Sequence, residues 1–148
     1  MTVEHFHEQV IAKGKIGGQA RAMVVTSSIP RCIRILLCHY KALIRKTQSY
    51  KAIVAFSGDH KYNGQEPPLT SAGINGFADS KIPKEFKKDP YRLLVVADMF
   101  QTGFDEPLLH TMYVDKQLYD IQAVQTLSRL NRCHPKKHDT CVFWTLPK

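Results

Sequence analysis

Short apolar runs alternate along this chain with one long stretch of helical periodicity. Three runs rich in Val, Ile, Leu and Ala predict buried strands, at Arg21–Thr26, Lys51–Phe56 and Tyr91–Ala97. Two shorter runs, Thr111–Val114 and Thr140–Leu146, predict further strands. Because the central runs are apolar throughout rather than alternating, they favour a mostly parallel sheet covered by helices on both faces.

A helix is predicted between the first two strands, from about Pro30 to Lys46, with Ser27-Ser28 supplying the N-cap. Its apolar positions fall on one face: Ile33, Leu36, Leu37, Tyr40 and Ile44. Its basic positions form a separate stripe: Arg31, Arg34, Lys41 and Arg45. Such a stripe is more often a solvated helix face than a contact with a phosphate backbone, and both interpretations remain open.

Glycines and prolines concentrate between residues 59 and 90, which predicts a loop-rich connection with one short helix around Ser71–Asp79. A further helix is expected at Asp120–Asn131. Ligands of parallel sheets bind at the carboxyl ends of the strands. Here those ends are followed by Thr26-Ser27, Ser57-Gly58 and Asp98–Asp105.

Three polar side chains fall on one face of the expected helix at 120–131 and of the residue that follows it: Gln125, Arg129 and Arg132. Two neighbouring guanidinium groups suit phosphate oxygens, as an arginine finger requires. The chain nevertheless has neither a GxxxxGK[ST] loop nor a GxGxxG loop. These two features together predict half of a shared nucleotide site, with the phosphate-binding loop on another domain.

The length of 148 residues suits one domain, and a net charge of +8 favours a polyanionic partner, with nucleic acid ahead of an anionic membrane surface. The four cysteines form no CxxC pair, so reduced, buried thiols are expected. The spacing of Cys133, His134, His138 and Cys141 fits no common zinc module, and no metal site is predicted. Residues 1–20 lack a signal-peptide pattern, and cytoplasmic localisation without membrane association is expected.

The ordered motifs resemble those of the second RecA-like domain of superfamily 2 helicases and translocases. Gln125-x-x-x-Arg129-x-x-Arg132 resembles motif VI, Asp98–Asp105 resembles motif V, and Arg21–Ser27 resembles the motif IV strand. Within that superfamily, AMVVTSS, VVADMFQTGFDEP, LHTMYVDK and QAVQTLSRLNR are similar to the motor (R) subunit of type I restriction enzymes. The resemblance covers about residues 20–146. It implies that residues 1–20 connect to a preceding domain and that 21–148 form the second RecA-like domain.

The resemblance also implies roles for individual residues. Arg132 matches the finger that reaches the γ-phosphate, Arg129 a second phosphate-contacting or domain-coupling arginine, and Gln125 a residue that orients phosphate or water. Gly103 and Asp105 match the motif V pair near the nucleotide. The implied DNA contacts are Thr26, Ser27, Thr102 and Arg31. At Arg31 the sequence departs from the expected pattern, because Ile29-Pro30 separate it from the motif IV serine.

For the full protein, the resemblance implies an ATP-dependent motor that pumps double-stranded DNA and cleaves it remotely. ATP and Mg²⁺ would be held mainly by the preceding RecA-like domain, and methylation and specificity subunits would complete the complex. The isolated domain is expected to be inactive. The alternatives are another superfamily 2 helicase acting on RNA or DNA, and a stand-alone basic nucleic-acid-binding module.

Overall fold

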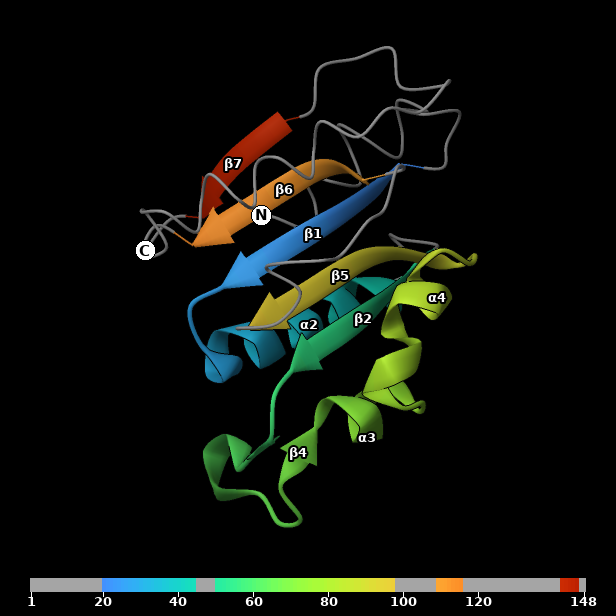
Figure 1. The fold of residues 1–148 in the computed structure, drawn as a ribbon. Coiled ribbons are helices and arrows are strands. Elements are labelled where there is room, and N and C mark those ends of the chain that lie inside the picture. Colours follow the sequence, from blue (N-terminus) through green and yellow to red (C-terminus); the bar gives the residue numbers. More distant parts are fainter. Residues whose placement is uncertain (1–19, 45–49, 98–108, 116–141, 147–148) are drawn as a thin grey trace.

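The core of the molecule is one parallel β-sheet (Figure 1). The computed structural model describes residues 20–44, 50–97, 109–115 and 142–146. The sheet order is β2-β5-β1-β6-β7, and every neighbouring pair is parallel. The strands are β1 (Arg21–Thr26), β2 (Lys51–Phe56), β5 (Tyr91–Ala97), β6 (Leu109–Asp115) and β7 (Val142–Leu146).

Helices cover both faces of the sheet, as the sequence predicts. Helix α2 (Ile29–Ile44) packs on one face, where Ile33 and Leu36 join alternate strand residues such as Val95 in a buried cluster. Helix α4 (Ile82–Phe86) packs on the other face, and its two end residues are fully buried there. Consecutive strand residues thus supply two separate cores, which explains why the strands are apolar at nearly every position.

The connection from β2 to β5 contains more structure than expected. It runs through β3 (Asp59–His60), η3 (Tyr62–Gly64), β4 (Leu69–Thr70), α3 (Ser71–Asn75), η4 (Asp79–Lys81) and α4. The predicted helix at 71–79 ends at Asn75, because Gly76 adopts a left-handed C-cap conformation with φ of 82°. The sequence analysis did not predict α4, whose short apolar pattern gives little helical signal on its own.

Arg21 joins the start of β1 to the end of α4. Its side chain is 2% exposed, its Nε donates to Phe86 O at 2.8 Å, and its Nη2 donates to Lys87 O at 2.9 Å. These carbonyls belong to the C-terminal turn of α4, which has no further helical N–H groups to accept from. One buried guanidinium therefore fixes the helix on the sheet.

The buried face of α2 is rotated from the predicted one. Leu37 and Tyr40, placed with the apolar face, are 43% and 37% exposed, whereas His39 is fully buried and its ring lies 5.1 Å from the Tyr50 ring. Cys38 is also exposed, so the prediction of a buried thiol is wrong at that position. An imidazole can be buried against an aromatic ring. A prediction of the buried face of α2 from hydrophobicity alone therefore missed His39 and included Leu37 and Tyr40.

The remaining boundaries agree within two residues where they can be compared. Helix α2 begins one residue before Pro30, and β6 extends the predicted Thr111–Val114 strand at both ends. The expected helix at 120–131 lies outside the described residues. Within the described ranges, no helix is both long enough and apolar enough to cross a membrane.

Candidate nucleotide and nucleic-acid interface

The carboxyl ends of three strands lie level at one edge of the sheet. Thr26 of β1 pairs with Ala97 of β5, and Ala97 pairs with Phe56 of β2. The segments that follow these three residues therefore leave the sheet side by side. This carboxyl edge is where a parallel α/β sheet binds its ligands, and it is the edge that the sequence analysis selected.

Thr26 has a structural role at this edge. Its side chain is fully buried, and its hydroxyl lies 2.9 Å from Val96 O and 3.1 Å from Ser28 O. The hydroxyl carries one proton, which these two carbonyls share. The bond ties the end of β1 to the end of β5 and orients the turn into α2. Its side chain is thus occupied internally, and a phosphate contact from Thr26 would have to come from its main chain.

Ser27 and Arg31 are half-buried on either side of the start of α2. The helix begins at Ile29, and Cys32 N donates to Ser28 O at 3.1 Å. Its first turn contains no acidic residue. A helix N-terminus without a carboxylate, next to a guanidinium, has the electrostatic character that suits an anion. The DNA contacts at Ser27 and Arg31 stay predictions, and the electrostatic surroundings of both residues favour a phosphate.

The other predicted site residues lie outside the described residues: Gln125, Arg129, Arg132, Gly103, Asp105 and Thr102. The described strands fix only where their segments begin and end. The segment with Thr102–Asp105 leaves the carboxyl end of β5 and returns to the amino end of β6. The segment with Gln125–Arg132 connects β6 to β7. Their roles toward the nucleotide remain predictions.

A polar cluster that the sequence analysis missed supports the end of β2. The Ser71 hydroxyl lies 2.5 Å from Asp79 Oδ1 and 3.2 Å from Phe56 O. The following turn includes Gly58, whose φ of 77° favours glycine. Thr70 caps α3 by accepting from Gly73 N at 3.0 Å. The Thr-Ser pair at the start of a short helix is the sequence signal for this arrangement.

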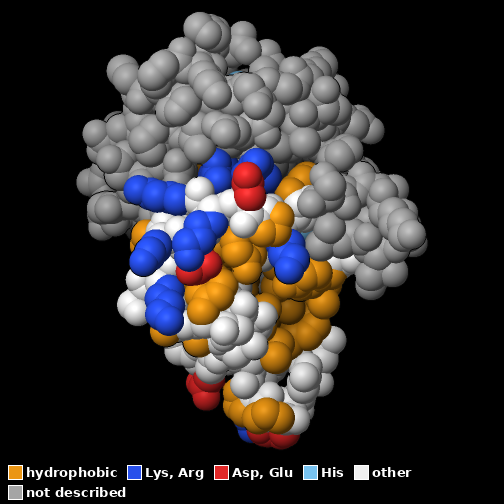
Figure 2. All heavy atoms as spheres, turned by 90° about the vertical axis from the view of Figure 1, so that its right-hand side faces the viewer, with side chains coloured by type: hydrophobic (Ala, Val, Ile, Leu, Met, Phe, Trp, Pro, Cys, Tyr) orange, Lys and Arg blue, Asp and Glu red, His pale blue; other side chains and the backbone are white. Residues whose placement is uncertain are grey.

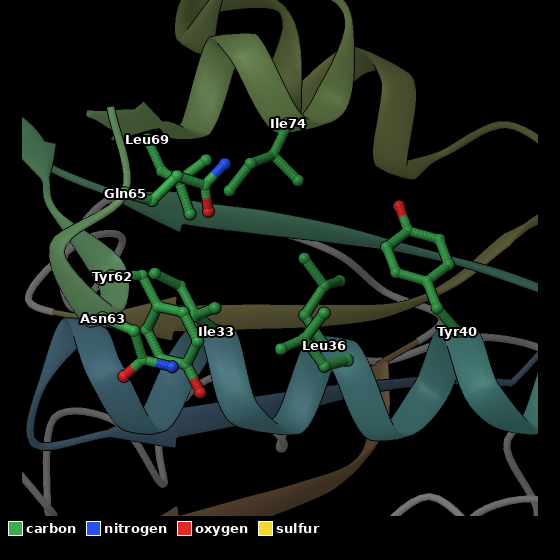
Figure 3. Close-up of a pocket in the computed structure, with 9 residues that line it drawn as sticks. Ile33, Leu36, Tyr40, Tyr62, Asn63, Gln65, Leu69 and Ile74 are labelled. Atoms are coloured by element: carbon green, nitrogen blue, oxygen red, sulfur yellow. The ribbon is translucent and has the colours of Figure 1, made fainter. Parts of the chain in front are cut away.

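An open groove of about 570 Å³ lies between α2 and the segment 62–74 (Figure 3). Figure 3 shows Ile33, Leu36 and Tyr40 on α2 facing Leu69 and Ile74. The described residues that line it are Ile33, Leu36, Leu37, Tyr40, Tyr62, Asn63, Gln65, Leu69 and Ile74. No charged side chain is among them, so this groove does not have the chemistry for a nucleotide triphosphate.

The described thiols and acidic groups offer no evident metal chemistry. Cys32 is buried, and its thiol donates to Val95 O at 3.5 Å. Burial raises the pKa of the Cys32 thiol to about 12, so it stays protonated and inert at neutral pH. In the ranges 20–44, 50–97, 109–115 and 142–146, no group of three or more His, Cys, Asp or Glu side chains could hold a metal ion. A Mg²⁺ ion held mainly by another domain remains a prediction.

Sequence relatives of this chain are subunits of restriction enzymes. A putative type I restriction enzyme MjaIXP endonuclease subunit from Methanocaldococcus jannaschii is 32% identical over 141 residues, which are 91% of this chain and 12% of the relative. The type I restriction enzyme HindI endonuclease subunit from Haemophilus influenzae is 38% identical over 58 residues, or 38% of this chain and 6% of the relative. The chain thus spans about an eighth of the length of the Methanocaldococcus jannaschii relative.

The fold has a counterpart among solved structures. Domain 2 of the DEAD-box helicase Mss116p, bound to an RNA duplex, superposes with a TM-score of 0.54 at 16% identity, covering 98% of this chain and 48% of that one. At this identity the similarity establishes the fold, which confirms the predicted RecA-like architecture. The family model for type I restriction enzyme subunit R domain 3 (T1R_D3-like) matches residues 60–144. Because that match covers more than half of the sequence, the chain belongs to the type I restriction enzyme R-subunit family, as its helicase-like domain 3.

Proposed function

We propose that this chain is the second motor domain of an ATP-dependent translocase that pumps double-stranded DNA within a type I restriction enzyme, which then cleaves the DNA remotely. The observation that carries the proposal is the level carboxyl edge formed by Thr26, Phe56 and Ala97 in a chain of this family. The segment that holds Thr102–Asp105 follows Ala97 at that edge, and the segment that holds Gln125–Arg132 follows β6, which pairs in parallel with β1.

The nucleotide is proposed to be shared between two domains. ATP, with Mg²⁺, supplies the phosphoryl group that is transferred to water, and the preceding domain supplies the phosphate-binding loop. Arg132 would stabilise the charge that develops on that group, Arg129 would hold a neighbouring phosphate oxygen, and Gln125 would orient the attacking water. Gly103 would allow the main chain to approach the phosphates, and Asp105 would pair with Arg129 when the nucleotide leaves.

Coupling to DNA is proposed to run through the Thr26 hydroxyl. Its bond to Val96 O joins the end of β1 to the strand that leads into Thr102–Asp105. A nucleotide-dependent shift of that segment would therefore move the turn at Ser27 and the start of α2. DNA phosphates held by main-chain N–H groups at Thr26 and Ser27, and by Arg31 and Thr102, would be gripped or released in step.

Arg132→Ala in the full-length R subunit tests this proposal. ATP hydrolysis should fall by about 10³–10⁵, while ATP binding is kept, because the finger acts on the developing charge rather than on ground-state binding. Lys61→Ala, which removes one exposed cation from the β3–β4 hairpin, is the control and should hydrolyse ATP normally. Near-normal turnover in the Arg132 variant would sink the assignment. Competition between DNA and RNA duplexes would separate a DNA motor from an RNA helicase.

A further inference from the structure

Exposed lysines gather at the amino edge of the sheet, opposite the carboxyl edge. Figure 2 shows Lys and Arg side chains concentrated on the face of the molecule that carries α4. We refer to four of these lysines as the amino-edge patch: Lys51, Lys84, Lys87 and Lys88. The sequence analysis singled out the basic stripe on α2 and did not identify this patch.

The patch is carried by a rigid support. Ile82 and Phe86 are fully buried, so α4 turns its lysines outward. The Arg21 guanidinium fixes the end of this helix through Phe86 O and Lys87 O. Lys51 N donates to Pro90 O at 2.9 Å, which places the start of β2 beside the turn that follows α4. The lysines therefore form one continuous surface although they lie far apart in the sequence.

Most of this positive charge is not neutralised locally. Lys88 pairs with Glu85 at 2.8 Å, and Arg92 pairs with Asp89. In the described part of the chain, no carboxylate lies within ion-pair distance of three of these lysines: Lys51, Lys84 and Lys87. The patch thus keeps a net positive field that an external anion would meet.

This arrangement is unfavourable for the isolated helix. Lys84 and the C-cap residue Lys87 are three residues apart, a spacing at which like charges repel. The helix dipole favours cations at the C-terminal end, which accounts for Lys87 and Lys88. It does not account for Lys51, which lies on the neighbouring strand. An anionic partner would relieve the repulsion at all of these positions.

We propose that the amino-edge patch is a second contact with the phosphate backbone of double-stranded DNA, separate from the carboxyl edge. The inference rests on the proposed function. Lysine ammonium groups on flexible stems bind phosphates as point charges without reading sequence. The two aromatic rings near α4, Phe77 and Tyr91, are half-buried against each other at 6.2 Å, so they offer no platform for stacking single-stranded bases.

The amino edge and the carboxyl edge contact the DNA duplex at separate points. Strand β5 spans seven residues from one edge to the other, which corresponds to about 20 Å. Contacts at both edges would fix the orientation of the domain on the duplex, which a single phosphate site cannot do. The amino-edge patch therefore adds a DNA contact that does not depend on the nucleotide.

The test measures binding of the full R subunit, in its complex, to duplex DNA without a recognition sequence over a range of salt concentrations. The patch variant is Lys84→Gln/Lys87→Gln, and the control is Lys61→Gln, whose lysine is exposed but paired with Glu66. Each lost phosphate contact should flatten the plot of log K against log[salt] by about 0.9. Between about 50 and about 200 mM salt, the ratio of wild-type to patch-variant affinity should then shrink about 10-fold.

An unchanged slope in the patch variant, with unchanged thermal stability, would overturn the inference. So would an unchanged slope combined with weaker subunit assembly, which would assign the patch to an acidic protein surface instead. The outcome is independent of the ATP test. Arg132→Ala should leave the salt slope intact, and Lys84→Gln/Lys87→Gln should leave ATP hydrolysis at saturating DNA intact. Failure of either proposal is therefore distinguishable from failure of the other.

Discussion

The side-chain amide of Asn75 pairs with both main-chain groups of Val54. Asn75 Oδ1 accepts from Val54 N at 2.9 Å, and Asn75 Nδ2 donates to Val54 O at 2.6 Å. Strand β2 lies at the end of the sheet order, so Val54 has no neighbour on this side among the described strands. The Asn75 amide makes the two hydrogen bonds that a residue of a neighbouring strand would make with Val54. It both satisfies a buried position and blocks the edge against pairing with another chain.

Replacing Asn75 should destabilise the domain in proportion to the bonds lost. Asn75→Ala leaves both Val54 groups unsatisfied at a position where the Val54 side chain is fully buried, at a cost of about 1–3 kcal/mol for each group that water cannot reach. Asn75→Asp keeps only the acceptor and should fall between the two. Urea unfolding of the 148-residue chain measures the series, with the exposed Gln65→Ala as control. Equal stability of Asn75→Ala and wild type would contradict the role of the amide.

The Arg21 guanidinium should not be replaceable by lysine. An ammonium group cannot donate to Phe86 O and Lys87 O in the geometry of the guanidinium fork. Arg21→Lys and Arg21→Met should therefore both destabilise the domain, by about 1.5–3 kcal/mol for each lost charged hydrogen bond. Hydrogen exchange should report the loss first in α4. Because α4 carries the amino-edge patch, both variants should also weaken the salt-dependent part of DNA binding.

The strands of this domain were predictable because burial on both faces makes each one a continuous apolar run. Arg21–Thr26, Lys51–Phe56 and Tyr91–Ala97 match the observed strands at both ends. Helix α4 was not predictable in the same way. It contains only five residues, and its position depends on a guanidinium from the far end of β1. A contact between residues 65 positions apart leaves no local pattern in the sequence.

The candidate site also has features that the sequence predicted and features that it did not. The carboxyl edge followed from strand order, since parallel strands bring their ends together wherever they lie in the chain. The internal role of the Thr26 hydroxyl did not follow, because its partner Val96 O is supplied by another strand. The amino-edge patch joins Lys51 to the lysines of α4 through the sheet. Sequence inspection sees these lysines only as separate surface charges.

Thr26→Val should lower stability, whereas Ser27→Ala should weaken DNA binding. Thr26→Val keeps the shape of the side chain but loses the bond to Val96 O, which should cost about 1 kcal/mol. Its effect on DNA affinity without ATP should be small, because the hydroxyl is buried, whereas the change in that affinity on ATP binding should weaken. Ser27 is half-buried at the edge and is a proposed DNA contact, so Ser27→Ala should weaken DNA binding. Thermal melting and duplex titration measure both, and Thr26→Ser, which keeps the hydroxyl, is the control.

The two described cysteines should differ sharply in reactivity. Cys38 is exposed on α2 and should react promptly with a thiol reagent at neutral pH, whereas Cys32 should react only when the domain unfolds. The measurement uses a Cys133→Ser/Cys141→Ser background, so that only these two thiols are counted, and Cys38→Ser identifies the fast phase. Prompt reaction of both thiols in the folded protein would contradict the burial of Cys32.

The buried Cys32 thiol should also make the fold sensitive to alkali. Burial raises the pKa of this thiol from 9.0 to about 12, so the folded state retains a proton that the unfolded state has released. The resulting stabilisation is fully present below pH 9 and is lost as the pH rises from 9 toward 12. Burial raises the pKa of Tyr50 and Tyr113 as well, which extends the loss to higher pH. Urea unfolding from pH 8 to 11 should therefore show falling stability, with a smaller fall in Cys32→Ala than in Cys38→Ala. Identical pH profiles for the two variants would contradict the raised pKa of the buried Cys32 thiol.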